Sequence, residues 1–129
     1  MPVTFTIPEQ LVRATIVGEN RLTEPEFREF LSAVLDHPEF RPGTDVIYDR
    51  RSVVVPPDDD FVRAALGAIR ERADRFRGGR WAVVIPSGAV LEVVRMTSLL
   101  GEQSGIEARP FVEMKDALAW LGRPGRDEV

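Results

Sequence analysis

Residues 44–61 read Thr44-Asp-Val-Ile-Tyr-Asp-Arg-Arg-Ser-Val-Val-Val-Pro-Pro-Asp-Asp-Asp-Phe61 and set the architecture of the chain. The run Val46-Ile-Tyr48 is short, apolar and rich in β-forming residues, which predicts a buried strand. Charged residues end this run at once, and Pro56-Pro57 excludes regular structure in the loop that follows. The three residues Asp58-Asp-Asp60 then open a segment with helical periodicity. The stretch therefore predicts a strand, a charged loop and the beginning of a helix.

Strand and helix patterns alternate along the rest of the chain. Further strands are predicted at Val3–Ile7, Leu11–Val17, Trp81–Ile85 and Ile106–Val112. Helices are predicted after the capping box Thr23-Glu-Pro-Glu26, and over Asp58–Phe76, Val90–Leu100 and Met114–Leu121. The first two strands are close enough to pair as a hairpin, and the later alternation predicts parallel pairing with right-handed crossovers. We therefore expect an α/β fold with a mixed, mostly parallel five-stranded sheet, an N-terminal β-hairpin and about four helices.

The length of 129 residues suits one domain with one core. We assign residues 1–122 to that domain. Residues 123–129 are polar and contain no apolar anchor before the last position, so we expect a flexible C-terminal tail.

Composition excludes several classes of function. The formal net charge of −4 argues against nucleic acid as the main partner. The absence of cysteine excludes disulfides, thiol catalysis and Cys-ligated metal. No apolar run approaches the roughly 18 residues that a membrane span needs, and the N-terminus does not read as a signal peptide. We therefore expect a cytoplasmic protein with no membrane span, no nucleic-acid partner, no metal and no cofactor.

The first candidate site is the charged loop Asp49, Arg50, Arg51 and Ser52. It follows a buried strand, and in open α/β sheets ligands and partners bind at the carboxyl ends of the strands. Two interpretations are open: a solvated loop with a local ion pair, or a recognition surface at a crevice. Ser52 is not favoured as an activated nucleophile, because the only histidine of the chain, His37, lies far away in the sequence.

The second candidate site is the acidic run Asp58, Asp59 and Asp60. Acidic residues at a helix N-terminus cap free backbone N–H groups and complement the helix dipole. Consecutive helical residues point about 100° apart, so the three carboxylates do not converge on a metal ion. A Ca²⁺ or Mg²⁺ site would need further oxygens from Asp49 or the backbone.

Two more positions complete the candidate set. Ser87 follows the strand at Trp81–Ile85 and fits the N-cap of the next helix. Met96 lies on that helix, which carries few charges; it either packs in the core or belongs to a self-association face of a homodimer, or to a lid over an apolar pocket. No Gly-rich phosphate loop, zinc spacing or nucleophile elbow is present in the sequence, so we predict that the protein is not an enzyme.

Several short motifs occur together in an order that resembles a known family. They are Gly18 after the second strand, Leu22-Thr-Glu24, Asp36-His-Pro-Glu-Phe40, Val46-Ile-Tyr-Asp-Arg50 and, at the end, Phe111 followed by Asp116-Ala-Leu-Ala-Trp-Leu121. In this order they resemble the SpoIIAA-like group, described as STAS/SEC14-like and related to the bacterial anti-sigma-factor antagonists. The resemblance spans Val3 to Leu121 and implies a STAS-like fold.

In the antagonists, the loop before the second helix carries Asp-Ser-Ser-Gly or a close variant, and a partner kinase phosphorylates one serine there. The matching place in this chain reads Asp58-Asp-Asp-Phe61 and contains no serine. An aspartate carries one negative charge where a phosphoserine carries about −1.5 to −2. The resemblance therefore implies a regulatory or protein-interaction module whose state at this site is fixed.

The SEC14-like side of the resemblance implies a different function. A binder of an apolar small molecule or lipid would hold its ligand beneath the third helix. Under this alternative we expect a cavity lined by Val90, Val94, Met96 and Phe111.

Overall fold

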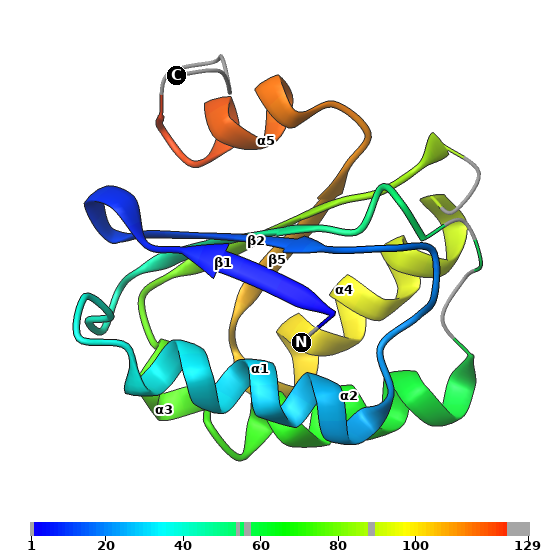
Figure 1. Cartoon of the computed structure of the whole chain (residues 1–129), viewed down its shortest axis with the longest axis horizontal. Coiled ribbons are helices and arrows are strands. Elements are labelled where there is room, and N and C mark those ends of the chain that lie inside the picture. The colour runs from blue at the N-terminus through cyan, green and yellow to red at the C-terminus, as the bar shows by residue number, and fades with distance from the viewer. Residues whose placement is uncertain (1, 54, 56–57, 88–89, 124–129) are drawn as a thin grey trace.

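The computed structural model describes residues 2–53, 55, 58–87 and 90–123, with the backbone alone for residues 90–92. Figure 1 shows the strands as one sheet with helices on both faces. In chain order the elements are β1 (Val3–Thr6), the 3₁₀ helix η1 (Pro8–Gln10), β2 (Leu11–Ile16), α1 (Glu24–Asp36), β3 (Asp45–Asp49), α2 (Asp59–Arg70), α3 (Ala73–Phe76), β4 (Arg80–Val84), α4 (Val90–Ser104), β5 (Glu107–Phe111) and α5 (Met114–Trp120).

The sheet has five strands in the order β1-β2-β3-β4-β5. The first two strands are antiparallel, and all later neighbours are parallel. This confirms the predicted mixed, mostly parallel sheet with an N-terminal hairpin. β5 contains Pro110 and lies at an edge, where a missing N–H costs least.

The strand order decides where the helices lie. Each parallel strand is added on the same side of the one before it, so right-handed crossovers place their helices on one face. Figure 1 shows α1, α2, α3 and α4 below the sheet and α5 above it. The main core lies on the four-helix face. A smaller cluster joins α5 to the other face through Leu11, Ile47 and Val84.

The same strand order removes the crevice that we expected beside the loop after β3. A crevice of that kind forms where the order of strands reverses and neighbouring loops leave toward opposite faces. In this sheet the order never reverses. The carboxyl ends of β2, β3, β4 and β5 instead form one continuous edge.

The capping box of α1 forms as predicted. The hydroxyl of Thr23 accepts from the backbone N–H of Glu26 (3.3 Å), and the Glu26 carboxylate accepts from the N–H of Thr23 (2.8 Å). The buried face of α1 consists of Phe27, Phe30, Leu31 and Val34. Local capping and apolar periodicity therefore agree with the tertiary packing of this helix.

The prediction of one continuous helix over residues 58–76 is wrong, because the helix breaks after Arg70 into α2 and α3. The sequence around the break contains no glycine or proline. The guanidinium of Arg72 donates to the carbonyl of Ala68 (2.8 Å) at the end of α2. Phe76 is buried edge-on against Phe40 and Trp81, with centroid distances of 5.5 and 5.3 Å. These tertiary contacts outweigh the local preference for one helix.

Arg123 is the first residue of the predicted tail. Its guanidinium donates to the carbonyls of Glu9 (2.7 Å) and Gln10 (3.1 Å), and it also reaches the carboxylate of Asp45 (3.5 Å). The remaining tail positions, 124–129, lie outside the described residues. Within the described part of the chain, no helix combines the length and apolarity that crossing a membrane would require.

Candidate functional site

The loop after β3 turns two of the predicted site residues away from the surface. Side chains alternate along a strand, so Arg50 follows Tyr48 onto the helix-covered face, and Asp49 follows Ile47 onto the face covered by α5. Only 6% of Arg50 and 8% of Asp49 is exposed. The prediction that Asp49 and Arg50 are displayed at the surface is therefore wrong.

The carboxylate of Asp49 finds its hydrogen-bond partners in Arg51, two residues further along the chain. Its carboxylate accepts from Arg51 at the backbone N–H (3.0 Å), at Nε (3.0 Å) and at Nη2 (2.8 Å). This bidentate arrangement is the local ion pair of the simpler interpretation. Asp49 is buried and Arg51 is partly exposed. Because loss of Arg51 would leave the buried carboxylate of Asp49 without its cation, we assign Arg51 a structural role.

Ser52 ties the loop to the neighbouring strand. Its hydroxyl lies within hydrogen-bonding distance of the carbonyls of Gly18 (2.5 Å) and Ile16 (3.1 Å), at the end of β2. A hydroxyl that donates to a carbonyl is not directed at a general base. The loop after β3 is thereby held beside the loop after β2.

The three consecutive aspartates diverge, as the helical spacing predicts. Asp58 caps α2 by accepting from the N–H of Phe61 (2.7 Å). Each carboxylate then meets a different arginine: Asp58 pairs with Arg21 (3.1 Å), Asp59 with Arg95 (3.3 Å) and Asp60 with Arg63 (3.1 Å). In the ranges that the structure describes, no group of three or more His, Asp or Glu residues could hold a metal ion. The pair Asp59–Arg95 links the beginning of α2 to α4.

Ser87 and Met96 differ in their exposure to solvent. Ser87 is exposed, and its predicted capping role concerns residues 88 and 89, which lie outside the described residues. Met96 is half-buried and packs against the main core, as the simpler interpretation expects.

The predicted lining of an apolar cavity is mostly wrong. Val94 is 42% exposed. Phe111 packs on Trp120 on the opposite face of the sheet, because successive residues of β5 point to opposite faces. The side chain of residue 90 lies outside the described residues.

A different cavity, of about 50 Å³, lies between the sheet and the helices α1, α2 and α4. Most of its walls are apolar side chains from all of these elements. Its polar groups are the side chains of Arg21, Tyr48, Arg50, Trp81 and Thr97. Pockets for drug-sized ligands typically measure about 300–1,000 Å³. This volume favours a very small occupant over a lipid.

Arg50 borders this cavity. Its Nη2 donates to the carbonyl of Val55 at 3.4 Å, and none of the described acidic residues forms an ion pair with it. Burial lowers the pKa of Arg50, and the nearby charge of Arg21 acts in the same direction. An arginine keeps its proton even so. A positive charge is therefore held in the interior beside apolar walls.

Tyr48 is expected to make the protein less stable at alkaline pH. Burial raises the pKa of its phenol well above the ordinary value of 10.0, against a smaller opposing effect of Arg50. Above about pH 10 the unfolded chain releases this proton while the folded chain keeps it. The free energy of unfolding should therefore fall with rising pH, by up to about 1.4 kcal/mol per pH unit.

Because the chain contains one tyrosine, the ultraviolet absorbance of tyrosinate reports this group directly. Denaturant unfolding on both sides of about pH 10 measures the accompanying loss of stability. The variant Tyr48→Phe serves as the control, since it should lack this component of the slope. Tyrosinate that forms at an ordinary pKa in the folded protein would contradict the assignment.

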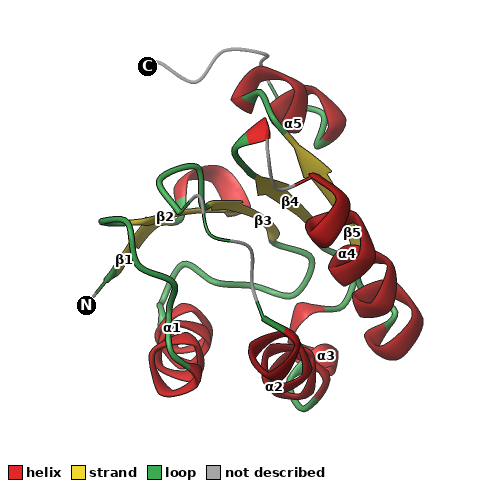
Figure 2. Ribbon diagram, turned by 90° about the vertical axis from the view of Figure 1, so that its right-hand side faces the viewer, coloured by secondary structure: helices red, strands yellow, loops and turns green. Residues whose placement is uncertain are grey.

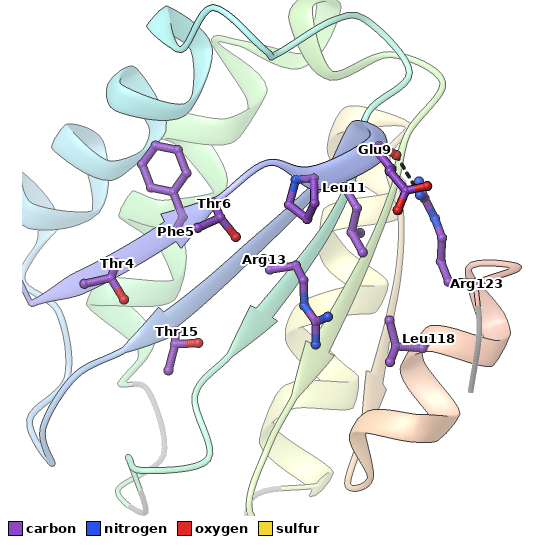
Figure 3. Close-up of a pocket in the computed structure, with 10 residues that line it drawn as sticks. Thr4, Phe5, Thr6, Glu9, Leu11, Arg13, Thr15, Leu118 and Arg123 are labelled. Atoms are coloured by element: carbon purple, nitrogen blue, oxygen red, sulfur yellow. Dashed lines mark hydrogen bonds between the residues drawn. The ribbon is translucent and has the colours of Figure 1, made fainter. Parts of the chain in front are cut away.

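A larger hollow of about 720 Å³ lies on the opposite face, beside β1 and β2. Figure 3 shows Thr4, Thr6, Arg13 and Thr15 along the two strands, and Arg123 reaching the backbone of Glu9. The hollow exists because α5 covers only part of this face. Its row of threonines is typical of a solvated sheet face, and none of its residues belongs to the predicted site.

The exposed aliphatic side chains lie on segments that follow the carboxyl ends of the strands. Among the described residues, the large apolar side chains that are well exposed are Val17 (58%), Val55 (51%), Val94 (42%) and Val112 (40%). Three of them follow the ends of β2, β3 and β5, and Val94 lies in α4, which follows β4. Figure 2 looks onto this edge. We call Val17, Arg51, Val55, Asp59, Asp60 and Val94 the carboxyl-edge surface.

Comparison with known proteins places the fold. A solved structure of an uncharacterised protein from the DUF3478 family with a SpoIIAA-like fold, from Shewanella loihica PV-4, matches this chain with a TM-score of 0.62. The match covers 92% of this chain and 93% of that chain, at 18% sequence identity. No protein-family model and no curated protein matches the sequence. The chain is therefore an α/β protein with a SpoIIAA-like fold, as the resemblance implied.

Proposed function

We propose that this protein is a non-enzymatic, cytoplasmic regulatory module that binds a protein partner through its carboxyl-edge surface. The SpoIIAA-like fold supports a regulatory module related in form to the anti-sigma-factor antagonists. The observation that carries the proposal is the position of the exposed valines. Single exposed apolar residues are common on any protein, but three of these follow the carboxyl ends of β2, β3 and β5, and the fourth lies in the helix after β4.

Exposed charges on the same helices and loop could supply a polar rim for the valines. Asp59 and Arg95 form an exposed pair between α2 and α4, and Arg51 is exposed on the neighbouring loop. Protein interfaces combine an apolar centre with a polar, solvated rim of this kind. Asp59 and Asp60 supply a permanent negative charge at the beginning of α2, so we propose that the module stays in one binding state.

Substitutions in the carboxyl-edge surface should weaken partner binding. Val55→Glu places a charge in the apolar centre, and we expect about a tenfold loss of affinity. Asp59→Ser and Asp60→Ser remove charges at the rim, and we expect a loss of about two- to fivefold for each. Affinity capture from native lysate identifies the partner, and titration of the purified partner measures the affinities.

The control is Arg77→Glu, which changes an equally exposed charge at the amino edge of the sheet, before β4. Its affinity should match that of the unmodified protein. Unchanged affinity in Val55→Glu would remove the apolar centre from the proposal. Unchanged affinity in both serine variants would count against a fixed charge state.

A further inference from the structure

The cavity beside Arg50 has hydrogen-bond donors and positive charge but no acidic group. Among the described residues that line it, two are arginines, Arg21 and Arg50, and none is Asp, Glu, His, Asn or Gln. The remaining polar side chains are hydroxyls and an indole N–H. Thr97 already donates to the carbonyl of Val94 (3.1 Å). An occupant that supplies acceptors would therefore complement the cavity.

Arg50 is the lining residue whose charge and hydrogen-bond donors are least satisfied by the described protein. A guanidinium carries five donors, and a buried charge is costly unless it is paired. The bond to the carbonyl of Val55 is long, at 3.4 Å. Asp49, the acid next to it in the chain, pairs with Arg51 on the other face, and Asp58 pairs with Arg21. The described protein supplies no anion for this charge.

Trp81 gives an independent sign of a missing acceptor. Its indole Nε1 is buried and has no hydrogen-bond partner among the described residues, and the side chain lines the same cavity. Buried polar groups in native proteins nearly always have partners. Trp81 of β4 lies opposite Val46 of β3 in the sheet, and Arg50 lies four residues after Val46. The lining therefore includes Arg50, whose one described hydrogen bond is long, and Trp81, whose buried donor has no partner among the described residues.

We propose that this cavity binds a short aliphatic monocarboxylate, with the carboxylate on Arg50 and the carbon chain against Phe27, Leu66 and Leu100. A carboxylate accepts two parallel hydrogen bonds from a guanidinium, which is among the strongest pairings in proteins. The apolar walls suit a hydrocarbon chain. A volume of about 50 Å³ leaves room for only a few non-hydrogen atoms. A long fatty acid does not fit.

Titration with propionate tests the proposal on the intact protein. The chain has two tryptophans, and Trp120 lies on α5 across the sheet. In two-dimensional ¹⁵N–¹H NMR spectra, we expect propionate to shift the indole signal of Trp81 saturably and to leave that of Trp120 in place. We expect propionamide, which has the same shape without the charge, and octanoate, which is too long, to produce no such shift.

Two variants separate ligand binding from a purely structural role of Arg50. Arg50→Met keeps an unbranched side chain but removes the guanidinium, and it should weaken propionate binding at least about tenfold. Ala65→Leu fills the cavity and should block binding while Arg50 remains, so it decides the matter if Arg50→Met does not fold. Arg63→Ala, on the exposed side of α2 and outside the cavity lining, should bind propionate as the unmodified protein does.

Three results would overturn the proposal: no saturable shift of the Trp81 signal, an equal shift with propionamide, or unchanged propionate affinity in Ala65→Leu. None of them bears on the capture of a protein partner, because neither Arg50 nor Ala65 belongs to the carboxyl-edge surface.

Discussion

Replacing Gly79 with alanine is expected to lower the free energy of unfolding by about 3 kcal/mol. Gly79 is buried just before β4, beside Thr44, which just precedes β3. A Cβ at this position would overlap the backbone carbonyl of Thr44, whose carbon would lie 2.9 Å away. Thr44 cannot give way easily, because its N–H and its hydroxyl are both hydrogen-bonded to the backbone of Arg41.

Denaturant titration measures this loss as a lower midpoint with an unchanged slope. The matched control is Gly67→Ala. Gly67 lies in the middle of α2, and an added Cβ there would meet no heavy atom within 4 Å. Alanine should raise the stability at this position by up to about 1 kcal/mol, since glycine is a poor helix former. Equal effects of the two substitutions would contradict the proposed contact between β3 and β4.

Replacing Phe30 with alanine should cost about 3–5 kcal/mol. This side chain of α1 is 1% exposed at the centre of the main core. It meets Phe5 edge-on, with the ring centroids 5.9 Å apart, and lies 5.7 Å from the ring of Tyr48. It thereby joins α1 to β1 and β3. Truncation removes these contacts and leaves a cavity that the surrounding sheet cannot close.

Phe30→Leu is the control for this truncation. It retains most of the apolar volume and should cost less than about 1.5 kcal/mol. Thermal unfolding followed by circular dichroism measures both variants. Similar melting temperatures for the alanine and leucine variants would contradict the central position of Phe30.

Local signals in the sequence predicted much of the fold. The capping box at Thr23 and Glu26 placed the beginning of α1, and the alternation of apolar runs with helical periodicity placed the parallel strands. These signals act over a few residues, so one sequence is enough to reveal them. The break before α3 was not predictable in this way, because it depends on contacts of Phe76 with residues distant in the chain.

The candidate site was predicted less well, and the reason is again physical. Charge indicated that Asp49 and Arg50 face solvent, whereas the period of two along β3 indicated that Arg50 follows Val46 and Tyr48 inward. In the structure, Arg50 points inward, as the alternation along the strand predicts. The cavity beside Arg50 could not be predicted, because its walls come from three helices and the sheet. Strand alternation was the signal that could have placed Arg50 at its edge.

Site-specific crosslinking tests the proposed interaction surface most directly. The chain contains no cysteine, so Val55→Cys and Arg77→Cys each introduce a single thiol for a photo-reactive label. Val55 lies at the carboxyl edge, and Arg77 lies at the amino edge. We expect the label at residue 55, and not the label at residue 77, to form a covalent adduct with one protein partner in native lysate. Adducts of that partner with residue 77 alone, or with both positions equally, would contradict the proposed surface.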